Sequence, residues 1–295
     1  MATFLGINLF GLFGQLLVGL INGSFYALLS LGLAIIFGLL KIINFAQGAM
    51  YMLGAFAAYL ALQHLGINYW AALVIVPLVI GAIGILMERV LIRPIANEDH
   101  LYSLLLTFGV ALVLQGIFTH LFGSSGLPYA IPEELNGGTK LPFMYLPNYR
   151  AWIIVASLAV CFGTWWMIEK TKLGAYLRAG TENPALMQAF GINVPLMVTL
   201  TFGFGVALAG FAGVMAAPVY SVSPDMGSNI LIVVFAIVVI GGMGSIGGAI
   251  LTGLGMGIVE GLTKYFYPEA STTVIFLVMV IVLLIKPAGL FGKEA

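Results

Sequence analysis

The chain has 295 residues, of which 61% are hydrophobic and 7% are charged. A soluble domain carries roughly 25% charged residues, so this chain cannot cover its whole surface with solvated side chains, and we expect a protein of the lipid bilayer. Eleven Lys and Arg balance eleven Asp and Glu, and this zero net charge offers no electrostatic footprint for nucleic acid.

Nine apolar stretches lie near the ~20 residues that a helix needs to cross about 30 Å of hydrocarbon. Because lipid cannot hydrogen-bond to bare backbone groups, each stretch is predicted to be helical. They are Leu12–Gly32, Phe45–Leu65, Tyr69–Leu91, Leu101–Phe122, Ala151–Ile168, Pro195–Ala217, Asn229–Met243, Gly248–Phe266 and Thr272–Ile285. Residues 33–40 could extend the first stretch or form a bent continuation of it, and the seventh is short enough to be re-entrant. The predicted fold class is therefore an all-α polytopic membrane protein with eight or nine transmembrane helices.

The basic residues orient these predicted spans, because Lys and Arg are enriched in cytoplasmic loops. With the N-terminus outside and the C-terminus inside, eight of the eleven lie on the cytoplasmic side: Lys41, Arg89, Arg93, Lys170, Lys172, Arg178, Lys286 and Lys293. Only Lys140, Arg150 and Lys264 are then external. We therefore predict an N-out, C-in domain over residues 1–295, with an external loop at 123–150 and a cytoplasmic loop at 170–194.

The sequence lacks the motifs of an ATP-hydrolysing or metal-dependent enzyme. It has no G-x-x-x-x-G-K-[ST] phosphate-binding loop, so ATP hydrolysis by that route is not expected in this chain. The histidines, His64, His100 and His120, do not have metal-ligand spacing. Ser245 has no histidine in a predicted span core that could serve as its base. We predict no catalytic residue, no metal and no cofactor.

Two predicted spans carry a small residue at every fourth position, a spacing that lets helix backbones approach closely. These residues are Gly205, Ala209, Gly213 and Ala217 in the sixth span, and Ala249, Gly253, Gly257 and Gly261 in the eighth. Helix packing is their expected role.

The segment IGGMGSIGGA, residues 240–249, lies between the sixth and the eighth predicted spans. Its glycines predict an unwound or sharply turned backbone. It is a candidate hinge or pore-lining element, and a plain tight turn is the alternative. The candidate glycines are Gly241, Gly242, Gly244, Gly247 and Gly248.

Polar residues inside the spans are candidates for a substrate pathway. Asn22 interrupts the first span, whereas Asn44, Gln47, Gly48 and Tyr51 fall at i, i+3, i+4 and i+7 and share one helix face. Side-chain amides face protein or water rather than lipid, so this stripe either lines a route for a neutral or zwitterionic solute or joins helices.

Glu260 is the one residue that the sequence nominates as a buried ionisable group, which in a membrane suggests a functional site. Lys264 follows it at i+4, the favoured order for an ion pair on a helix. A structural pair is therefore the alternative to a role in transport.

The polar stretch RAGTENPALMQAFGINV, residues 178–194, contains the start and stop signals of a short helix. Asn183 is a suitable N-cap, Pro184 occupies the first helical position, and Gly191 lies just past the end. The residues between them form only about two turns, too few for stability alone in water. We expect a partner surface to hold this helix.

Four segments carry a resemblance to a known family, in that family's order and across nearly the whole chain. They are LKIINFAQGAMYMLGAF, LGAYLRAGTENPALMQAFGINV, IGGMGSIGGAILTGLGMGIVEG and IKPAGLFG. The chain resembles the LivH-type permeases, which are membrane subunits of ATP-binding-cassette importers for branched-chain amino acids.

The resemblance implies that Glu182–Phe190 is the coupling helix that docks on the ATPase subunit, with Arg178 and Glu182 at its edge. The other residues that it assigns to this helix are Asn183, Pro184, Met187 and Phe190. It also implies a LivM-type second permease, two ATP-binding-cassette ATPase subunits, an extracytoplasmic substrate-binding protein and the prokaryotic cytoplasmic (inner) membrane. Leucine, isoleucine and valine are the implied substrates, moved by alternating access. Related permeases for urea, short-chain amides or aromatic acids are alternatives, as is a stand-alone channel or secondary carrier.

Overall fold

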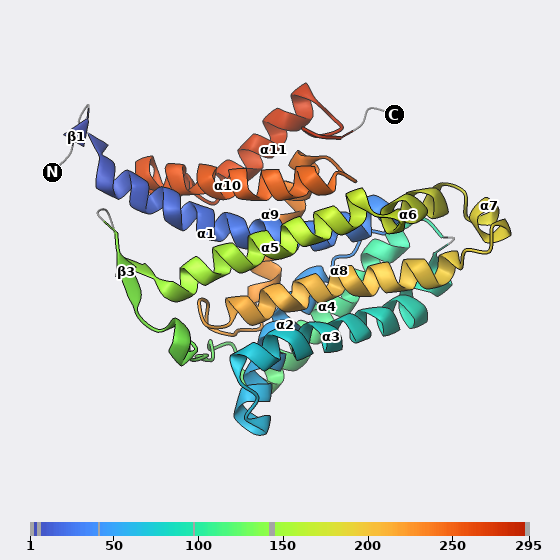
Figure 1. Cartoon of the computed structure of the whole chain (residues 1–295), viewed down its shortest axis with the longest axis horizontal. Helices are drawn as coiled ribbons and strands as arrows, with labels where there is room; N and C mark the ends of the chain where they lie inside the picture. Colours follow the sequence, from blue (N-terminus) through green and yellow to red (C-terminus); the bar gives the residue numbers. More distant parts are fainter. Residues whose placement is uncertain (1–2, 5–6, 41, 97, 142–144, 293–295) are drawn as a thin grey trace. The chain divides into compact units, whose positions relative to one another are not determined.

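The computed structural model describes residues 3–4, 7–40, 42–96, 98–141 and 145–292, and most of them are helical (Figure 1). The all-α prediction is confirmed. In the described part of the chain, strands form two short antiparallel pairs, β1 (Thr3–Phe4) with β2 (Ile7–Asn8) and β3 (Gly138–Lys140) with β4 (Tyr145–Pro147). The predicted external loop holds the second pair and the 3-10 turn η4 (Glu133–Leu135).

The chain divides into two compact units that each draw on segments distant in sequence. The first comprises the described residues of 1–30, 131–162 and 233–295, and the second those of 31–130 and 163–232. Three helices contribute residues to both units: α1 (Leu9–Ala34), α5 (Asn148–Lys170) and α9 (Met226–Gly241). The units are therefore interleaved along the sequence and are not consecutive domains.

The first unit is built around α10 (Ile246–Phe266) and α11 (Val274–Ile285), which are joined by the 3-10 turn η5 (Pro268–Ala270). Its apolar core consists of residues from α9, α10 and α11, namely Ala236, Ile237, Ile240, Met256, Ile275 and Val282.

The small residues of α10 lie directly against the backbone of α1. A Cβ added at Gly253 would lie 2.6 Å from the Cα of Ala27, and one at Gly257 would overlap the backbone of Gly19 and Gly23. Helix packing, the role predicted for these α10 glycines, is what the structure shows.

The glycine-rich segment between α9 and α10 is a turn, as the sequence indicates. The helix ends at Gly241, and Gly242 (φ 97°) and Gly244 (φ 95°) adopt the left-handed conformation that favours glycine. The seventh predicted span ran to Met243, which is two residues too far because the left-handed Gly242 stops the helix. Ser245 begins α10 as its N-cap and accepts a hydrogen bond of 3.0 Å from the amide of Gly248.

This turn is held by the segment that follows α11. The amide of Leu290 donates to the carbonyl of Ile240 (2.8 Å), and that of Phe291 donates to the carbonyl of Gly241 (3.1 Å). Gly289, at φ 80°, lies against Gly242 so closely that a Cβ there would be 2.5 Å from its Cα. Two of the segments that carry the family resemblance therefore contact each other.

The second unit is a helical bundle in which α8 lies along α2 and α3 (Figure 1). Its elements, besides its portions of α1, α5 and α9, are the π-helix η1 (Ile35–Leu39), α2 (Gln47–Leu65), α3 (Tyr69–Met87), the π-helix η2 (Glu88–Ile92), the 3-10 turn η3 (Arg93–Ile95), α4 (His100–Phe122), α6 (Lys172–Glu182), α7 (Pro184–Ala189) and α8 (Val194–Ala216).

Small residues again set the helix spacing in the second unit. A Cβ at Gly210 of α8 would lie 2.8 Å from the Cβ of Ile80, and one at Gly54 of α2 would be 2.7 Å from the Cα of Gly210. Gly205 lies against η1, where a Cβ would be 2.7 Å from Cγ1 of Ile36. The backbones of α2, α3 and α8 therefore lie nearly in contact.

Six helices among the described residues are long and apolar enough to cross a membrane: Leu9–Leu39, Tyr69–Ile95, His100–Phe122, Asn148–Lys170, Val194–Ala216 and Ile246–Phe266. The other three predicted stretches overlap α2 (19 residues), α9 (16 residues) and α11 (12 residues). Each predicted stretch thus contains a helix, and residues 33–39 do extend the first. The number of spans and their orientation stay predictions.

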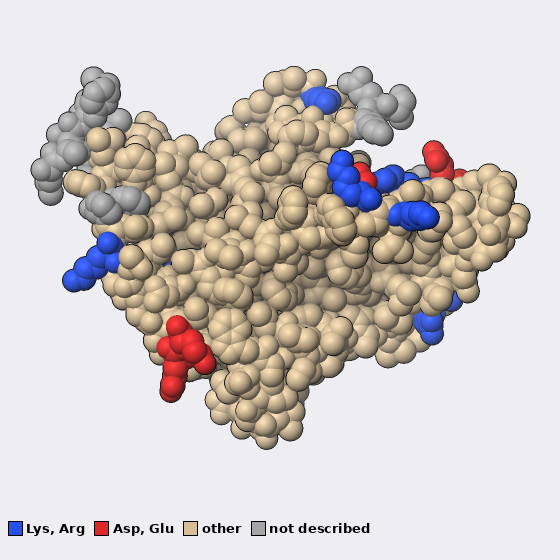
Figure 2. Space-filling view, in the orientation of Figure 1, with Lys and Arg blue, Asp and Glu red and all other residues tan. Residues whose placement is uncertain are grey.

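The surface of the chain suits a hydrocarbon environment. The face shown in Figure 2 is mostly uncharged, and several of its few acidic and basic side chains gather on the right of the view. Only 11% of the most apolar stretch of α4 is buried. Its exposed large side chains include Leu105, Leu112, Val113, Ile117 and Leu121. Such a surface is stable in lipid and not in water, which makes this a multi-pass membrane protein.

We predict that Gly253→Ala lowers stability by about 1–3 kcal/mol, the usual effect of overpacking, because its methyl group must displace the backbone of α1. Gly255→Ala is the matched control, since a Cβ at Gly255 would meet nothing within 4 Å. The thermal midpoint of the detergent-solubilised protein measures the difference. Equal midpoints for the two variants would contradict the contact between α10 and α1.

Candidate functional site

A polar cluster joins α1 to α10 in the first unit. The carboxylate of Glu260, 9% exposed, accepts a hydrogen bond at each oxygen. Nδ2 of Asn22 donates to Oε1 (3.4 Å), and the hydroxyl of Tyr26 donates to Oε2 (2.8 Å). The structure thus brings Asn22 and Glu260 together, as candidates for one site, and adds Tyr26.

The expected ion pair between Glu260 and Lys264 does not form. Within the described residues, the carboxylate faces the neutral donors of α1, whereas Lys264 is exposed. The favourable i, i+4 spacing is overridden because the glycines of α10 bring Asn22 and Tyr26 within hydrogen-bonding distance. The result is a carboxylate within a membrane helix that is held by neutral groups.

The polar stripe predicted on the second span is buried in the second unit. Asn44 and Gln47 are each 1% exposed, and Nδ2 of Asn44 donates to Oε1 of Gln47 (3.3 Å). Nε2 of Gln47 donates to the carbonyl of Gly205 (2.9 Å), which joins α2 to α8.

Asn44 does not share a helix face with the other members of the stripe, contrary to the predicted periodicity. The helix α2 begins at Gln47, because Oδ1 of Asn44 accepts from the amide of Ala46 (3.1 Å) and turns the chain before the helix.

The remaining two members of the stripe also lie at helix contacts. A Cβ at Gly48 would overlap the carbonyl of Gly227 in α9, and a Cβ at Gly213 of α8 would overlap the carbonyl of Tyr51. Tyr51 itself is 2% exposed. In this conformation the stripe joins helices, which is the second of the two roles that the sequence left open.

A small, mostly apolar pocket lies beside this stripe, between α2, α4 and the start of α9. Its lining includes Gly48, Phe108 and Gln115, and Nε2 of Gln115 donates to Oδ1 of Asp225 (2.7 Å). This pocket could not be predicted from the sequence, because its walls come from three separate segments.

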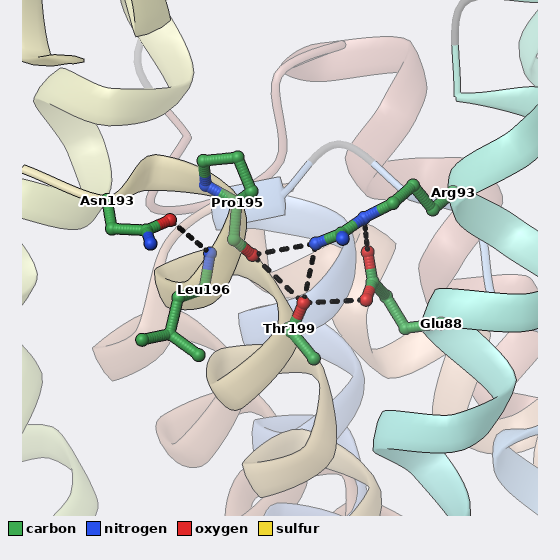
Figure 3. Close-up of polar contacts among 6 residues, drawn as sticks. All are labelled: Glu88, Arg93, Asn193, Pro195, Leu196 and Thr199. Atoms are coloured by element: carbon green, nitrogen blue, oxygen red, sulfur yellow. Dashed lines mark hydrogen bonds and ion pairs between the residues drawn. The ribbon is translucent and has the colours of Figure 1, made fainter.

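A second buried carboxylate, Glu88, lies where α3 gives way to η2 (Figure 3). It is 3% exposed, so the expectation that Glu260 is the one buried ionisable group was wrong. Nε of Arg93 lies 3.4 Å from Oε1 of Glu88, and the hydroxyl of Thr199 in α8 donates to Oε2 (2.7 Å). In the sequence Arg93 stood out only as a predicted cytoplasmic charge, and no pattern pointed to Glu88 or Thr199.

Arg93 also reaches the first turn of α8. Its Nη2 donates to the carbonyl of Pro195 (3.1 Å) and to Oγ1 of Thr199 (2.9 Å), so one guanidinium contacts both a carboxylate and the helix start (Figure 3). Asn193 caps the same turn and accepts from the amide of Leu196 (3.1 Å).

The short helix predicted at Glu182–Phe190 is present as α7. Oδ1 of Asn183 accepts from the amide of Leu186 (3.0 Å), Pro184 is the first residue, and Gly191 follows with φ 80°. The cap, start and stop signals are therefore confirmed. Two apolar side chains project from it, Leu186 (53% exposed) and Phe190 (74% exposed).

Of the other residues predicted to belong to the short helix, two lie outside α7. Met187 is half-buried, and Arg178 and Glu182 belong to the preceding helix α6. Nη1 of Arg178 lies 3.5 Å from Oε2 of Glu169 at the end of α5, so this cation is paired outside the short helix.

The sequence also matches a known protein family. Residues 15–283 match the model of the family described as "Branched-chain amino acid transport system / permease component". The chain belongs to this family of membrane permeases.

Curated relatives support the assignment along the full length. The permease proteins BraD of Pseudomonas aeruginosa and LivH of Escherichia coli (strain K12), both of high-affinity branched-chain amino acid transport systems, are each 32% identical to it, with 95% of both chains covered. LivM of Escherichia coli (strain K12), a permease protein of the same kind of system, is 28% identical over 90% of this chain and 67% of its own length. No solved structure matches the chain.

We predict that Gln47→Leu lowers stability, because an unpaired buried amide on Asn44 costs about 1–3 kcal/mol. The exposed Gln63→Leu, on the same helix, is the matched control. Membrane abundance and the thermal midpoint are measured together with uptake. Unchanged stability with reduced uptake would contradict the helix-joining role and favour a pathway role for Gln47.

Proposed function

We propose that this protein is the transmembrane permease subunit of an ATP-binding-cassette importer for branched-chain amino acids. The family membership and the names of the curated relatives support the substrate class. The sequence lacks a phosphate-binding loop, so ATP hydrolysis belongs to separate ATPase subunits. The chain itself changes no covalent bonds and alternates between outward- and inward-facing states.

The partners follow from the same argument. The similarity to both LivH and LivM supports a second permease of the LivM type. Two ATPase subunits and an extracytoplasmic substrate-binding protein complete the importer. The prokaryotic cytoplasmic membrane, with the N-terminus outside, is the proposed location.

The observation that carries this proposal is the geometry of α7. A helix of six residues exposes Leu186 and Phe190 outside the bundle, although exposed apolar side chains of this size are unfavourable in water. The cap at Asn183 holds the first turn of α7 in its helical conformation. We assign α7 as the coupling helix, which inserts this apolar surface into a groove of the ATPase.

The cluster of Asn22, Tyr26 and Glu260 is the strongest candidate for the substrate pathway. Asn22 and Tyr26 are partly exposed near the middle of α1, and polar groups at membrane depth contact protein or water rather than lipid. A carboxylate with neutral partners attracts a cation, and a zwitterionic amino acid supplies an ammonium group. Glu260 would contact that group during transport.

The remaining candidate residues take part in this proposal only when helices move. Asn44, Gln47, Gly48 and Tyr51 would line the pathway in a state that separates α2 from α8. The turn that contains Gly241, Gly242, Gly244, Gly247 and Gly248 would serve as a hinge between α9 and α10.

We predict that Phe190→Asp weakens ATPase association at least about tenfold, since a charge placed in an apolar groove without a partner costs several kcal/mol. Gln188→Asp, also exposed on α7, is the control for charge alone. Co-purification of the ATPase at equal permease abundance measures the effect, and uptake is recorded in parallel. Equal recovery and equal uptake with Phe190→Asp would contradict the coupling role.

We predict that Glu260→Gln lowers the initial rate of leucine uptake by about tenfold, because the amide keeps the side-chain shape but removes the charge that attracts the ammonium group. Glu269→Gln, in the exposed turn η5, is the control. Uptake into proteoliposomes at equal protein content tests this. Unchanged uptake by Glu260→Gln would make the cluster a structural link between α1 and α10.

A further inference from the structure

The cluster of Glu88, Arg93 and Thr199 connects two helices at the end where α8 begins (Figure 3). The residues are far apart in sequence, since the hydroxyl of Thr199 donates to a carboxylate 111 positions earlier. Glu88 begins the π-helix η2, which continues α3, and Arg93 directly follows its last residue. The side chain of Glu88 is thus directed at α8 by the same backbone that brings Arg93 alongside it.

The electrostatics of the cluster make it a strong link. A carboxylate that is 3% exposed is unfavourable unless it is paired, and Arg93 supplies the opposite charge at 3.4 Å. The guanidinium is more exposed than its partner, and its Nη2 is bonded to Thr199 and to the carbonyl of Pro195. Separating α3 from the first turns of α8 would therefore break the bond that Glu88 accepts from Thr199 and the two bonds that Nη2 of Arg93 donates to α8, whereas the pair of Glu88 with Arg93 would remain.

The cluster also lies on the route from α7 into the bundle. Residues 190–193 are all that separate α7 from α8, and Asn193 caps α8 at the turn that Arg93 contacts. A displacement of α7 would therefore be transmitted to α8 at its first turn. Further along, α8 meets α3 through apolar and glycine contacts such as Gly210 with Ile80, and contacts of that kind allow packed helices to slide.

We propose that Glu88, Arg93 and Thr199 form a clamp that makes α3 and α8 move as one pair when the ATPase displaces α7. They are positioning residues for the coupling of ATP hydrolysis to transport, and they contact neither substrate nor nucleotide. The proposal rests on the function proposed above for α7.

The first test separates hydrolysis from transport in the reconstituted complex of both permeases, the ATPases and the leucine-loaded binding protein. Thr199→Val keeps the shape of the side chain and removes the hydroxyl, whereas Thr199→Ser keeps the hydroxyl. We expect Thr199→Val to lower leucine uptake per ATP hydrolysed about tenfold, within the range of couplings between sites, while ATPase association stays at the wild-type level. Thr199→Ser restores the ratio.

Arg89→Gln is the control for a charge at the same helix end, since Arg89 is exposed and lies outside the clamp. It is expected to leave uptake per ATP unchanged. A wild-type ratio in Thr199→Val overturns the clamp. If the wild-type complex itself fails to hydrolyse ATP or to transport leucine, the proposed function fails instead, and the two failures are thereby distinguished.

A second measurement leaves Glu88, Arg93 and Thr199 unchanged. Spin labels at the exposed positions Leu86 of α3 and Leu200 of α8 report the distance between the two helices in the wild-type background. We expect the same distance without nucleotide and in the vanadate-trapped state, while a label pair between α8 and α4, at Leu200 and Leu105, changes. A changed distance between Leu86 and Leu200 would overturn the proposal.

Discussion

Contact between helix backbones at glycine is the interaction on which each unit depends. Lipid gives two apolar helices little reason to associate, because their side chains are no less soluble in hydrocarbon than in each other. Close packing must therefore supply the attraction, and it requires residues without bulk. Gly253 and Gly257 provide this surface against α1 in the first unit, and Gly205 and Gly210 provide it in the second.

The close spacing also decides where polar groups can meet. Because α10 touches α1, the carboxylate of Glu260 lies within reach of Asn22 and Tyr26. The approach of α8 to α2 likewise places the carbonyl of Gly205 2.9 Å from the amide of Gln47. Glu260 and Gln47 thus connect helices that glycines have already brought together, and both kinds of contact stabilise the same arrangement.

Local features were predictable from the sequence, and long-range ones were not. Asn183, Pro184 and Gly191 act on the backbone within a few residues, so their cap, start and stop roles could be predicted and are found in the structure. Apolar length likewise located the helices. Gly242 shifted one boundary because a single left-handed residue ends a helix abruptly, whereas hydropathy changes gradually along the chain.

The polar sites needed three-dimensional information. Glu88 finds its partner Thr199 on another helix, and neither residue has a neighbour in sequence that reveals the pair. Glu260 illustrates the reverse case, since a favourable neighbour at i+4 suggested a pair that the packing of α10 replaces. Helical spacing of polar residues also misled for Asn44, which lies before the helix and forms its start.

The paired asparagine caps of the segment that contains α7 have a consequence for assembly. Asn183 and Asn193 fix the first turns of α7 and α8, so the segment between them is held at both ends before any partner arrives. Binding then loses little backbone entropy, because the bound conformation is largely present beforehand. Preorganisation of this kind favours rapid docking over folding upon binding, and it would keep the segment stiff through repeated cycles of the proposed ATPase partner.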